Sequence, residues 1–381
     1  MKILQVTAAL NEGGVERGTL EMAAFIVAQG AKSYVASNGG KLVSLLEKSG
    51  GEHFLLPLAK RRPWAILGSA LQLAKIIRQH EIDLVHARSR APAWAALIAC
   101  RITRTPMVTT FHGTHKIQNR LKWFYNSAMV RGERVIAISE FIRAHIIENY
   151  QVAPARIDLA PRGFDPEEFN PEDYDRQAVH EMKRKLELEA GVPVITLPGR
   201  LTRWKGQTLF LQALGELKDL PWQALLIGGA GKKVAYENEL KTLAYHLGIA
   251  DRVKFLGSRS DIAACYALSD IVVSASTEPE AFGRVAIEAQ AMGKPIIASA
   301  HGGSLETVKD GLSGWLYSPL SSQDMAAKLR LALSADTDLP ATGSAGRRWV
   351  VENYTVEQMC QAEWRAYAAV CPSLPTAAEN P

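Results

Sequence analysis

Apolar residues along this chain form short continuous runs that alternate with longer stretches in which apolar positions recur every three to four residues. Short runs are typical of buried strands, and the longer periodic stretches are typical of amphipathic helices. In the first half the predicted strands are residues 2–7, 33–37, 54–56, 83–87, 107–112 and 134–139, and the predicted helices are 18–29, 64–80 and 91–100. Strands alternating with helices predict a parallel, doubly wound sheet.

The same alternation starts again after a linker, residues 158–171, that contains three prolines. There the predicted strands are residues 194–200, 222–227, 253–256, 271–276, 296–299 and 315–317, and the predicted helices are 176–188, 207–217, 234–247, 260–268, 285–292, 323–334 and 356–370. A chain of 381 residues has room for two such domains. The sequence therefore predicts an α/β protein with two domains.

The apolar runs and the cysteines of the sequence indicate a cellular location. No apolar run approaches the roughly 20 residues that a spanning helix needs, and Met1–Leu10 is too short for a signal peptide. Cys100, Cys265, Cys360 and Cys371 show no CxxC spacing, which indicates free thiols in a reducing compartment. We therefore expect a cytoplasmic protein.

The charge is distributed unevenly along the chain. Residues 1–150 hold 20 Lys and Arg against 10 Asp and Glu, whereas the remainder holds 24 against 29. If this is not chance, the first half faces an anionic partner such as a membrane surface or a phosphorylated acceptor; nucleic acid is disfavoured, because no nucleic-acid motif accompanies the charge. Two basic, aromatic segments, residues 60–64 and 116–134, fit anionic headgroups, and an ordinary solvated helix is the alternative for the second.

Two glutamates stand out in the βαβ unit of residues 271–299. Glu280 lies in the predicted loop after the first strand, and Glu288 lies on the following helix. Eight helical positions correspond to about 12 Å of rise, so the two carboxylates are not expected to hold one atom together. They can instead bind two parts of one extended ligand at the carboxyl end of the strand.

Several other loops at predicted strand ends carry groups that suit a nucleotide-sugar. Arg200 and Lys205 suit a diphosphate, the glycines of residues 228–231, Gly229 among them, allow close approach of a flat ligand or phosphate, and the amides around Phe282 supply donors at a helix start. Gly13 and Gly14 between the first strand and helix can do the same for a phosphate or sugar, and His112 before Gly113 is a candidate ligand contact. Each feature alone is weak, and together they indicate a nucleotide-sugar site.

Asp173-Tyr174-Asp175 matches the DxD pattern by which some glycosyltransferases hold a metal ion. It lies in a polar stretch before a predicted helix and not at a strand end, so we interpret it as solvated charge. No metal and no cofactor are expected.

The combined pattern resembles the retaining GT-B glycosyltransferases of family 4 over nearly the whole chain. The motifs that carry the resemblance are Glu280-x7-Glu288, Gly199-Arg200 with Lys205-Gly206, Gly283, Glu288-Ala-x-Ala-x-Gly293 and the N-terminal Gly13-Gly14 loop. The resemblance implies two Rossmann-like domains facing across a cleft, with a C-terminal helix that crosses back. It places an acceptor-binding domain at residues 1–162 joined by residues 356–372, a nucleotide-sugar domain at residues 163–355 and a flexible tail at residues 373–381.

The resemblance also assigns roles to individual residues. Glu288 is expected to bind the ribose of the donor, and Glu280 to contact the transferred sugar. The neighbours expected to complete the donor site are Ala281, Phe282, Gly283, Arg284 and Gly229. Arg200 and Lys205 are expected to hold the diphosphate as it departs, Gly14, beside Gly13, to approach the phosphates and His112 to lie near the reacting face of the sugar. Retention of the anomeric configuration without a protein nucleophile or metal is a further implication.

The sequence departs from the family pattern in two places. The linker reads Arg162-Gly163 where the family often has Asn-Gly, and Glu278 could be mistaken for the first glutamate, although only Glu280 has the right spacing. No general acceptor motif is present. Arg88, Arg90 and Ser139 are our candidates for acceptor contacts.

The expected activity is transfer of a hexose-type sugar from a UDP- or GDP-sugar to a glycan or lipid-linked acceptor, such as lipopolysaccharide or another cell-envelope glycan, with possible peripheral association at the inner face of the cytoplasmic membrane. A GT-B-fold UDP-N-acetylhexosamine 2-epimerase and a non-catalytic sugar-nucleotide-binding protein remain as alternatives. A nicotinamide-dependent dehydrogenase is disfavoured, because Asn11-Glu12-Gly13-Gly14 does not supply the GxGxxG motif.

Overall fold

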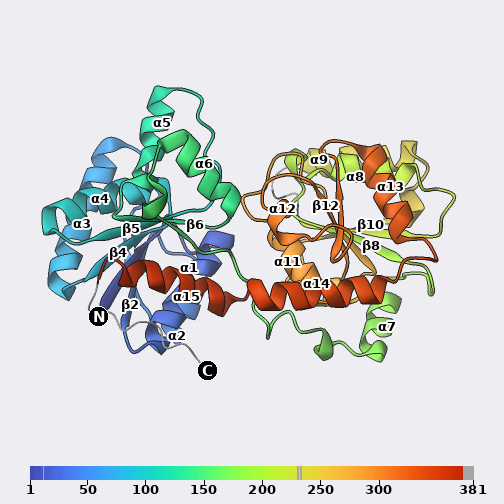
Figure 1. Ribbon diagram of the computed structural model, residues 1–381, viewed down its shortest axis with the longest axis horizontal. Helices are drawn as coiled ribbons and strands as arrows, with labels where there is room; N and C mark the ends of the chain where they lie inside the picture. Colours follow the sequence, from blue (N-terminus) through green and yellow to red (C-terminus); the bar gives the residue numbers. More distant parts are fainter. Residues whose placement is uncertain (12, 230, 232–233, 372–381) are drawn as a thin grey trace. The chain divides into compact units, whose positions relative to one another are not determined.

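The computed structural model describes residues 1–11, 13–229, 231 and 234–371 of the chain. Their contacts divide the chain into two compact units (Figure 1). Unit 1 comprises Met1–Arg162 together with the C-terminal segment from Val356, and unit 2 comprises Gly163–Thr355. Each unit is described separately below.

Unit 1 is built on a seven-stranded parallel sheet with the strand order β3-β2-β1-β4-β5-β6-β7. The strands are β1 (Lys2–Val6), β2 (Lys32–Ser37), β3 (Glu52–Leu55), β4 (Leu84–Ala87), β5 (Met107–Phe111), β6 (Arg134–Ala137) and β7 (Ile157–Leu159). The helices are α1 (Gly14–Ala28), α2 (Val43–Lys48), α3 (Pro63–His80), α4 (Arg90–Thr103), α5 (Arg120–Asn126), α6 (Glu140–Tyr150) and, from the C-terminal segment, α15 (Val356–Ala368). α15 packs into the same core as β1, β4 and β5, with Trp364 and Tyr367 fully buried.

Unit 2 repeats the architecture with a six-stranded parallel sheet in the order β10-β9-β8-β11-β12-β13. The strands are β8 (Val194–Pro198), β9 (Gln223–Ile227), β10 (Val253–Gly257), β11 (Ile271–Ser274), β12 (Ile296–Ser299) and β13 (Gly314–Tyr317). The helices are α7 (Arg176–Lys185), α8 (Gln207–Gly215), α9 (Val234–His246), α10 (Ile262–Ala267), α11 (Arg284–Ala291), α12 (Ser304–Thr307), α13 (Ser322–Ala332) and α14 (Leu339–Asn353). The strands are almost continuously apolar, as expected for a sheet with both faces covered.

The two parallel, doubly wound sheets confirm the predicted fold class, and most predicted elements lie within a few residues of the observed ones. Three local differences stand out. Helix α1 begins at Gly14 and not at residue 18, and strand β7 occupies part of the segment interpreted as a linker. Helices α6 and α14 were not predicted, and the glycines of α14 are typical of a loop. Here they permit close packing, since a Cβ on Gly343 would lie 1.9 Å from the carbonyl oxygen of Gly293.

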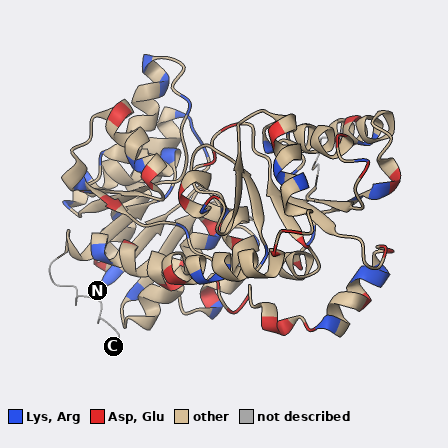
Figure 2. Cartoon of the chain, turned by 45° about the vertical axis from the view of Figure 1, so that its right-hand side comes forward, with Lys and Arg blue, Asp and Glu red and all other residues tan. Residues whose placement is uncertain are grey.

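Charged side chains lie mainly on the surface of each unit, and the strands of each sheet carry few of them (Figure 2). Among the described residues, no helix is long and apolar enough to cross a membrane. All four cysteines are buried as free thiols.

Candidate active site

Glu280 lies in the loop that follows β11, and its carboxylate is tied to the loop that follows β8. Its Oε1 accepts a hydrogen bond from Nζ of Lys205 at 2.6 Å and a second, short one from the hydroxyl of Ser276. The side chains of Lys205 and Glu280 are only 15% and 12% exposed. Because β8 and β11 are parallel neighbours, their following loops meet at the carboxyl edge of the sheet. The pair is therefore a partly buried ion pair at the edge where such sheets bind ligands.

A glycine controls how Lys205 reaches this position. Gly206 has a φ of 72°, and a Cβ there would lie 1.8 Å from the carbonyl oxygen of Ala275. Only glycine allows both the left-handed conformation and this close approach of the two loops. A backbone hydrogen bond of 2.8 Å from Thr277 to the carbonyl of Trp204 joins the same loops.

Glu288 lies on α11, about one turn after its start, and is also held by neighbours. Its Oε1 lies 2.8 Å from Nη2 of Arg284, and its Oε2 accepts a hydrogen bond of 3.1 Å from the hydroxyl of Tyr266. Burial, reinforced by the charge of Glu288, raises the pKa of Tyr266 well above its ordinary value, so the phenol acts as a donor. A carboxylate has about four acceptor positions, so Glu288 keeps capacity for further hydroxyl groups.

The start of α11 lies between the two glutamates in the sequence. Gly283 is its N-cap with a φ of 92°, and the preceding Phe282 is buried against Tyr354 with ring centroids 5.5 Å apart. The backbone amide of Gly303 donates a 2.9 Å hydrogen bond to the carbonyl of Glu280, which joins this loop to the segment after β12. The first amides of a helix have no intrahelical acceptor, and the helix dipole makes this end favourable for an anion. Ala281 completes this short connection.

The loops after β8 and β9 approach each other closely enough to need glycine. A Cβ on Gly228 would lie 2.0 Å from the carbonyl oxygen of Gly199, and Leu201 donates a 3.2 Å hydrogen bond to the carbonyl of Gly229. Arg200 is exposed at this edge, and its carbonyl accepts a hydrogen bond from the side-chain Nε2 of Gln207. A cavity of about 550 Å³ opens beside Arg200 and Trp204. The prediction for residues 230, 232 and 233 of the glycine loop lies outside the described residues.

In unit 1, Gly13 is the N-cap of α1 and Gly14 is its first residue. The carbonyl of Gly14 accepts a short hydrogen bond from Nη2 of Arg162, whose Nη1 lies 3.4 Å from Sδ of Met359 on α15. Arg162, the residue at which the sequence departs from the family pattern, is therefore buried under the glycine loop.

His112 follows β5, and its Nε2 is buried without a hydrogen-bond partner among the described residues. Burial lowers the pKa of His112 well below its ordinary value, and the positive charges of Arg162 and Arg88 act in the same direction. The imidazole is thus neutral. Because a buried polar atom normally has a partner, this nitrogen is available to a ligand hydroxyl group.

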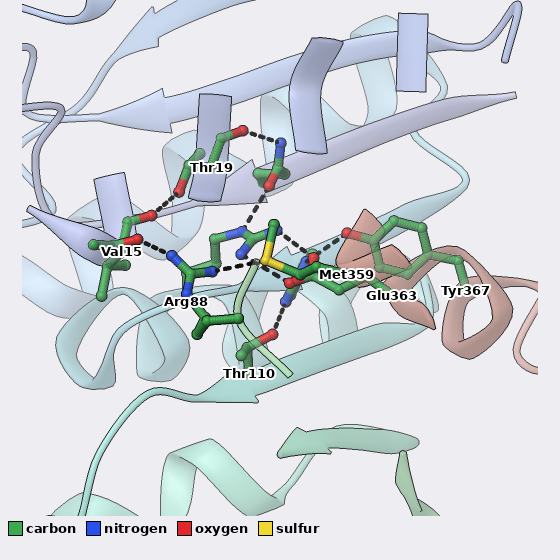
Figure 3. Close-up of polar contacts among 11 residues, drawn as sticks. Val15, Thr19, Arg88, Thr110, Met359, Glu363 and Tyr367 are labelled. Carbon is green, nitrogen blue, oxygen red and sulfur yellow. Dashed lines mark hydrogen bonds and ion pairs between the residues drawn. The ribbon is translucent and has the colours of Figure 1, made fainter. Parts of the chain in front are cut away.

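Two of the three candidate acceptor contacts, Arg88 and Ser139, have other roles in unit 1. Arg88 is 1% exposed and donates from Nη2 to Glu363 at 2.5 Å and from Nε to Gln5 at 2.6 Å (Figure 3). Its guanidinium serves an internal ion pair with α15, which contradicts the expectation of an acceptor contact. Ser139 is fully buried and caps α6 through a hydrogen bond from the amide of Ile142, a structural role that also contradicts an acceptor contact.

Arg90 is partly exposed, and its Nη1 donates to the side chain of Asn126 at 3.0 Å. It remains a candidate for the acceptor side. Asp175 caps α7 and Asp173 accepts from Asn170, as expected of solvated charge. Among the described residues, no group of three metal-ligating side chains is arranged around a common point.

Two residues that orient the glutamates were not predicted from the sequence. Ser276 stands two positions beyond β11, where its hydroxyl could have been suspected from its place at a strand end. Tyr266 belongs to α10 and gave no local signal, because its partner Glu288 is 22 positions away. The predicted residues of unit 2 nevertheless come together at one edge, whereas Gly13, Gly14 and His112 belong to unit 1.

Two family models match this chain. The model for glycosyl transferases group 1 matches residues 179–349, and the model for glycosyltransferase family 4 matches residues 12–168. Among curated proteins, a D-inositol 3-phosphate glycosyltransferase of Mycolicibacterium vanbaalenii is 35% identical over 284 residues. The matched part covers 68% of this chain and 61% of that relative.

Solved structures match over nearly the whole length. A glycosyltransferase from Rickettsia africae is 36% identical with a TM-score of 0.91, and the match covers 98% of this chain and 99% of the other. Anabaena Alr3699/HepE in complex with UDP is 27% identical with a TM-score of 0.84, covering 97% of this chain and all of that one. Both the match to the Rickettsia structure and the two family models lead to the same assignment. The chain belongs to the GT-B glycosyltransferases of family 4, the glycosyl transferases group 1.

Proposed function

We propose that this protein is a retaining hexosyltransferase that uses a nucleotide-sugar donor, and that unit 2 binds the donor. The observation that carries the proposal is the meeting of Lys205 with Glu280, 2.6 Å apart, at the carboxyl edge where α11 begins. A cation, a carboxylate and the N-terminus of a helix in one place suit a ligand that carries both a diphosphate and sugar hydroxyl groups.

Each group has a distinct task in the proposed reaction. Lys205, Arg200 and the first amides of α11 stabilise the negative charge that grows on the diphosphate as the glycosidic bond breaks. Glu280 is held by Lys205 and Ser276, and a carboxylate engaged by a cation is a weak nucleophile. We therefore assign Glu280 the role of accepting hydrogen bonds from the transferred sugar and not that of attacking it. Glu288 uses its remaining acceptor positions for the ribose.

His112 is proposed to contact the sugar through its unpartnered Nε2. Its neutral state suits exchange of a hydrogen bond with a hydroxyl group. The reaction is proposed to need no metal and no cofactor, since fixed cations supply the charge that a metal supplies elsewhere. Full activity after treatment with a chelator is the expected outcome, and loss of activity that magnesium or manganese restores would contradict it.

For the donor we propose a UDP- or GDP-sugar, with UDP favoured because related Anabaena Alr3699/HepE structures hold UDP and UDP-glucose. The test is a screen of UDP-, GDP- and ADP-sugars for hydrolysis and for an increase in melting temperature. One nucleotide should stabilise the protein clearly more than the others. If none of these nucleotide-sugars shifts the melting temperature, the proposal is wrong.

A GT-B-fold epimerase acting on UDP-N-acetylhexosamine is the alternative that uses the same donor. The two activities differ in their products. Proton NMR of the reaction should show a new glycoside with the anomeric configuration of the donor. Conversion of the donor sugar into its C2 epimer without any acceptor would instead establish the epimerase.

For the acceptor we propose a glycan or lipid-linked molecule of the cell envelope, such as lipopolysaccharide, met at an anionic membrane surface. Helix α3 supports this with a stripe of exposed apolar residues, Trp64, Leu67 and Leu71, and with Arg62 5.6 Å from the ring of Trp64. Helix α5 exposes Leu121 and Phe124 beside basic residues. Such surfaces bind anionic lipid through apolar burial and charge together.

Co-sedimentation with liposomes tests the membrane part. The protein should sediment with vesicles that contain an anionic phospholipid at low salt, and not with neutral vesicles. Failure to sediment with anionic vesicles at low salt would exclude the membrane association.

Because the relatives include D-inositol 3-phosphate glycosyltransferases, inositol phosphate belongs in the acceptor assay beside lipid-linked glycans.

A further inference from the structure

Unit 2 contains a second cavity, of about 570 Å³, against helix α7. We name it the α7 pocket. Its basic lining residues are Arg176, His180, Lys183, Arg184 and Lys294. Its floor is apolar and includes Leu188 and Met292, and the lining residues that the structure describes include no carboxylate. The volume is within the range typical of small-molecule sites.

The α7 pocket lies at the opposite edge of the sheet from the proposed donor site. Leu188 precedes β8, Ala267 precedes β11 and Lys294 precedes β12, so the pocket lies at the amino ends of these parallel strands. The loops that carry Lys205 and Glu280 follow the carboxyl ends of β8 and β11. The α7 pocket is therefore a separate site on the same unit.

The position of Arg176 on α7 is unfavourable in the helix alone. Arg176, His180 and Arg184 stand at four-residue intervals, so they share one face of the helix. Arg176 is the first residue of the helix, where the helix dipole disfavours a cation. An anion in the pocket would offset this unfavourable position.

The charge of the pocket remains positive after its neighbours are included. Four lining residues carry permanent positive charge, whereas Asp270 lies 3.6 Å from Lys183 and offsets one of them. The C-terminal ends of α7 and α11 together contribute about one more negative charge. At the end lined by the lysines and Arg184 the remaining charge is therefore positive, which favours an anion there.

Lys294 is the most enclosed of these cations. Burial lowers the pKa of Lys294, Asp270 opposes the shift, and Lys183 adds to it. The charged form is therefore incompletely compensated, and a bound anion would compensate it.

Charges around Tyr174 indicate the orientation of a ligand. Burial raises the pKa of the Tyr174 phenol, and the nearby carboxylates of Asp173 and Asp261 add to the increase. An anionic group is disfavoured at that end of the pocket and favoured at the end lined by Lys183, Arg184 and Lys294. We propose that the α7 pocket binds a phosphate monoester, with its phosphate at this basic end and an apolar or aromatic group over the floor.

Isothermal titration calorimetry with phenyl phosphate tests this proposal. Binding to the wild type is expected in the millimolar range or tighter, and inorganic phosphate should bind more weakly because it leaves the apolar floor uncovered. Arg184→Gln should weaken phenyl phosphate binding about tenfold or more. Lys294→Gln is a second variant on another element and should have the same effect.

Two control variants show whether phenyl phosphate binds in the α7 pocket itself. Lys185→Gln removes a cation from the next position of α7, which is 68% exposed and does not line the pocket, and should leave binding unchanged. Lys205→Ala alters the proposed donor site alone and should also leave it unchanged. Equal loss in Arg184→Gln and Lys185→Gln, loss only in Lys205→Ala, or no binding by the wild type would each overturn the proposal. Because none of these readouts needs transferase activity, the result is independent of the proposed function.

Discussion

The ion pair between Arg88 and Glu363 supports a sharp prediction about the stability of unit 1. Both side chains are 1% exposed, and Arg88 contacts Glu363 through both terminal nitrogens, at 3.3 and 2.5 Å. Glu363→Gln keeps the shape of the side chain but leaves the guanidinium buried without its counter-charge. Breaking a buried pair in this way costs about 3–5 kcal/mol. For a unit of this size that corresponds to a decrease in melting temperature of roughly 6–20 °C.

Urea unfolding, together with hydrogen exchange of peptides from β4 and α15, measures this loss where the pair acts. Glu357→Gln on the same helix is the matched control, because Glu357 is exposed and its change should stay within about 0.5 kcal/mol. The double variant Arg88→Met with Glu363→Met removes both charges and should recover at least half of the lost stability. If Glu363→Gln and Glu357→Gln lose equal stability, the ion pair does not hold α15 as described.

Four further outcomes test the proposed donor site and the stability of the two units. Glu288→Ala should weaken UDP binding about 10- to 100-fold by calorimetry, and equal affinity would remove the ribose assignment. Lys205→Ala should lower kcat by about 10²–10³ with little change in KM. Gly206→Ala should lower the free energy of unfolding by about 2 kcal/mol or more, whereas Gly248→Ala, with a similar φ but no backbone contact, should lose less. Burial lowers the pKa of His115, four residues after the end of β5, to about 3. The contribution of the neutral imidazole to the free energy of unfolding is therefore fully present above about pH 6.5 and is lost as the pH falls towards 3. His115→Gln should reduce the decrease in the free energy of unfolding between pH 7 and pH 5 by about 2 kcal/mol.

The fold could be predicted because its signals are local. Alternating apolar runs and periodic stretches marked most strands and helices within a few residues. Helices α6 and α14 are the main exceptions. In α14, Gly343 and Gly346 are typical of a loop in the sequence, but in the structure they pack against Gly293 and Gln290. In a sequence, glycine usually indicates a flexible backbone, whereas in α14 it allows close contact with neighbouring residues.

The candidate site was predictable only where its residues follow strands in order. Glu280 and Lys205 lie directly after β11 and β8, so topology alone brings them together. Arg88 was misread as an acceptor contact because its partner, Glu363, is 275 positions away. A cation after a strand has the same sequence signal whether its counter-charge is a ligand or a distant helix.

Unit 1 is assembled from two stretches of chain that are separated by the whole of unit 2. During synthesis Gly163–Thr355 leaves the ribosome before α15, so unit 2 can complete its sheet while unit 1 still lacks its last helix. Until then the Arg88 charge and the apolar surface that will receive Trp364 are uncovered. Helix α15 is thus synthesised after unit 2 but completes unit 1, and a nascent chain stalled before residue 356 would expose unit 1 to chaperones and proteases.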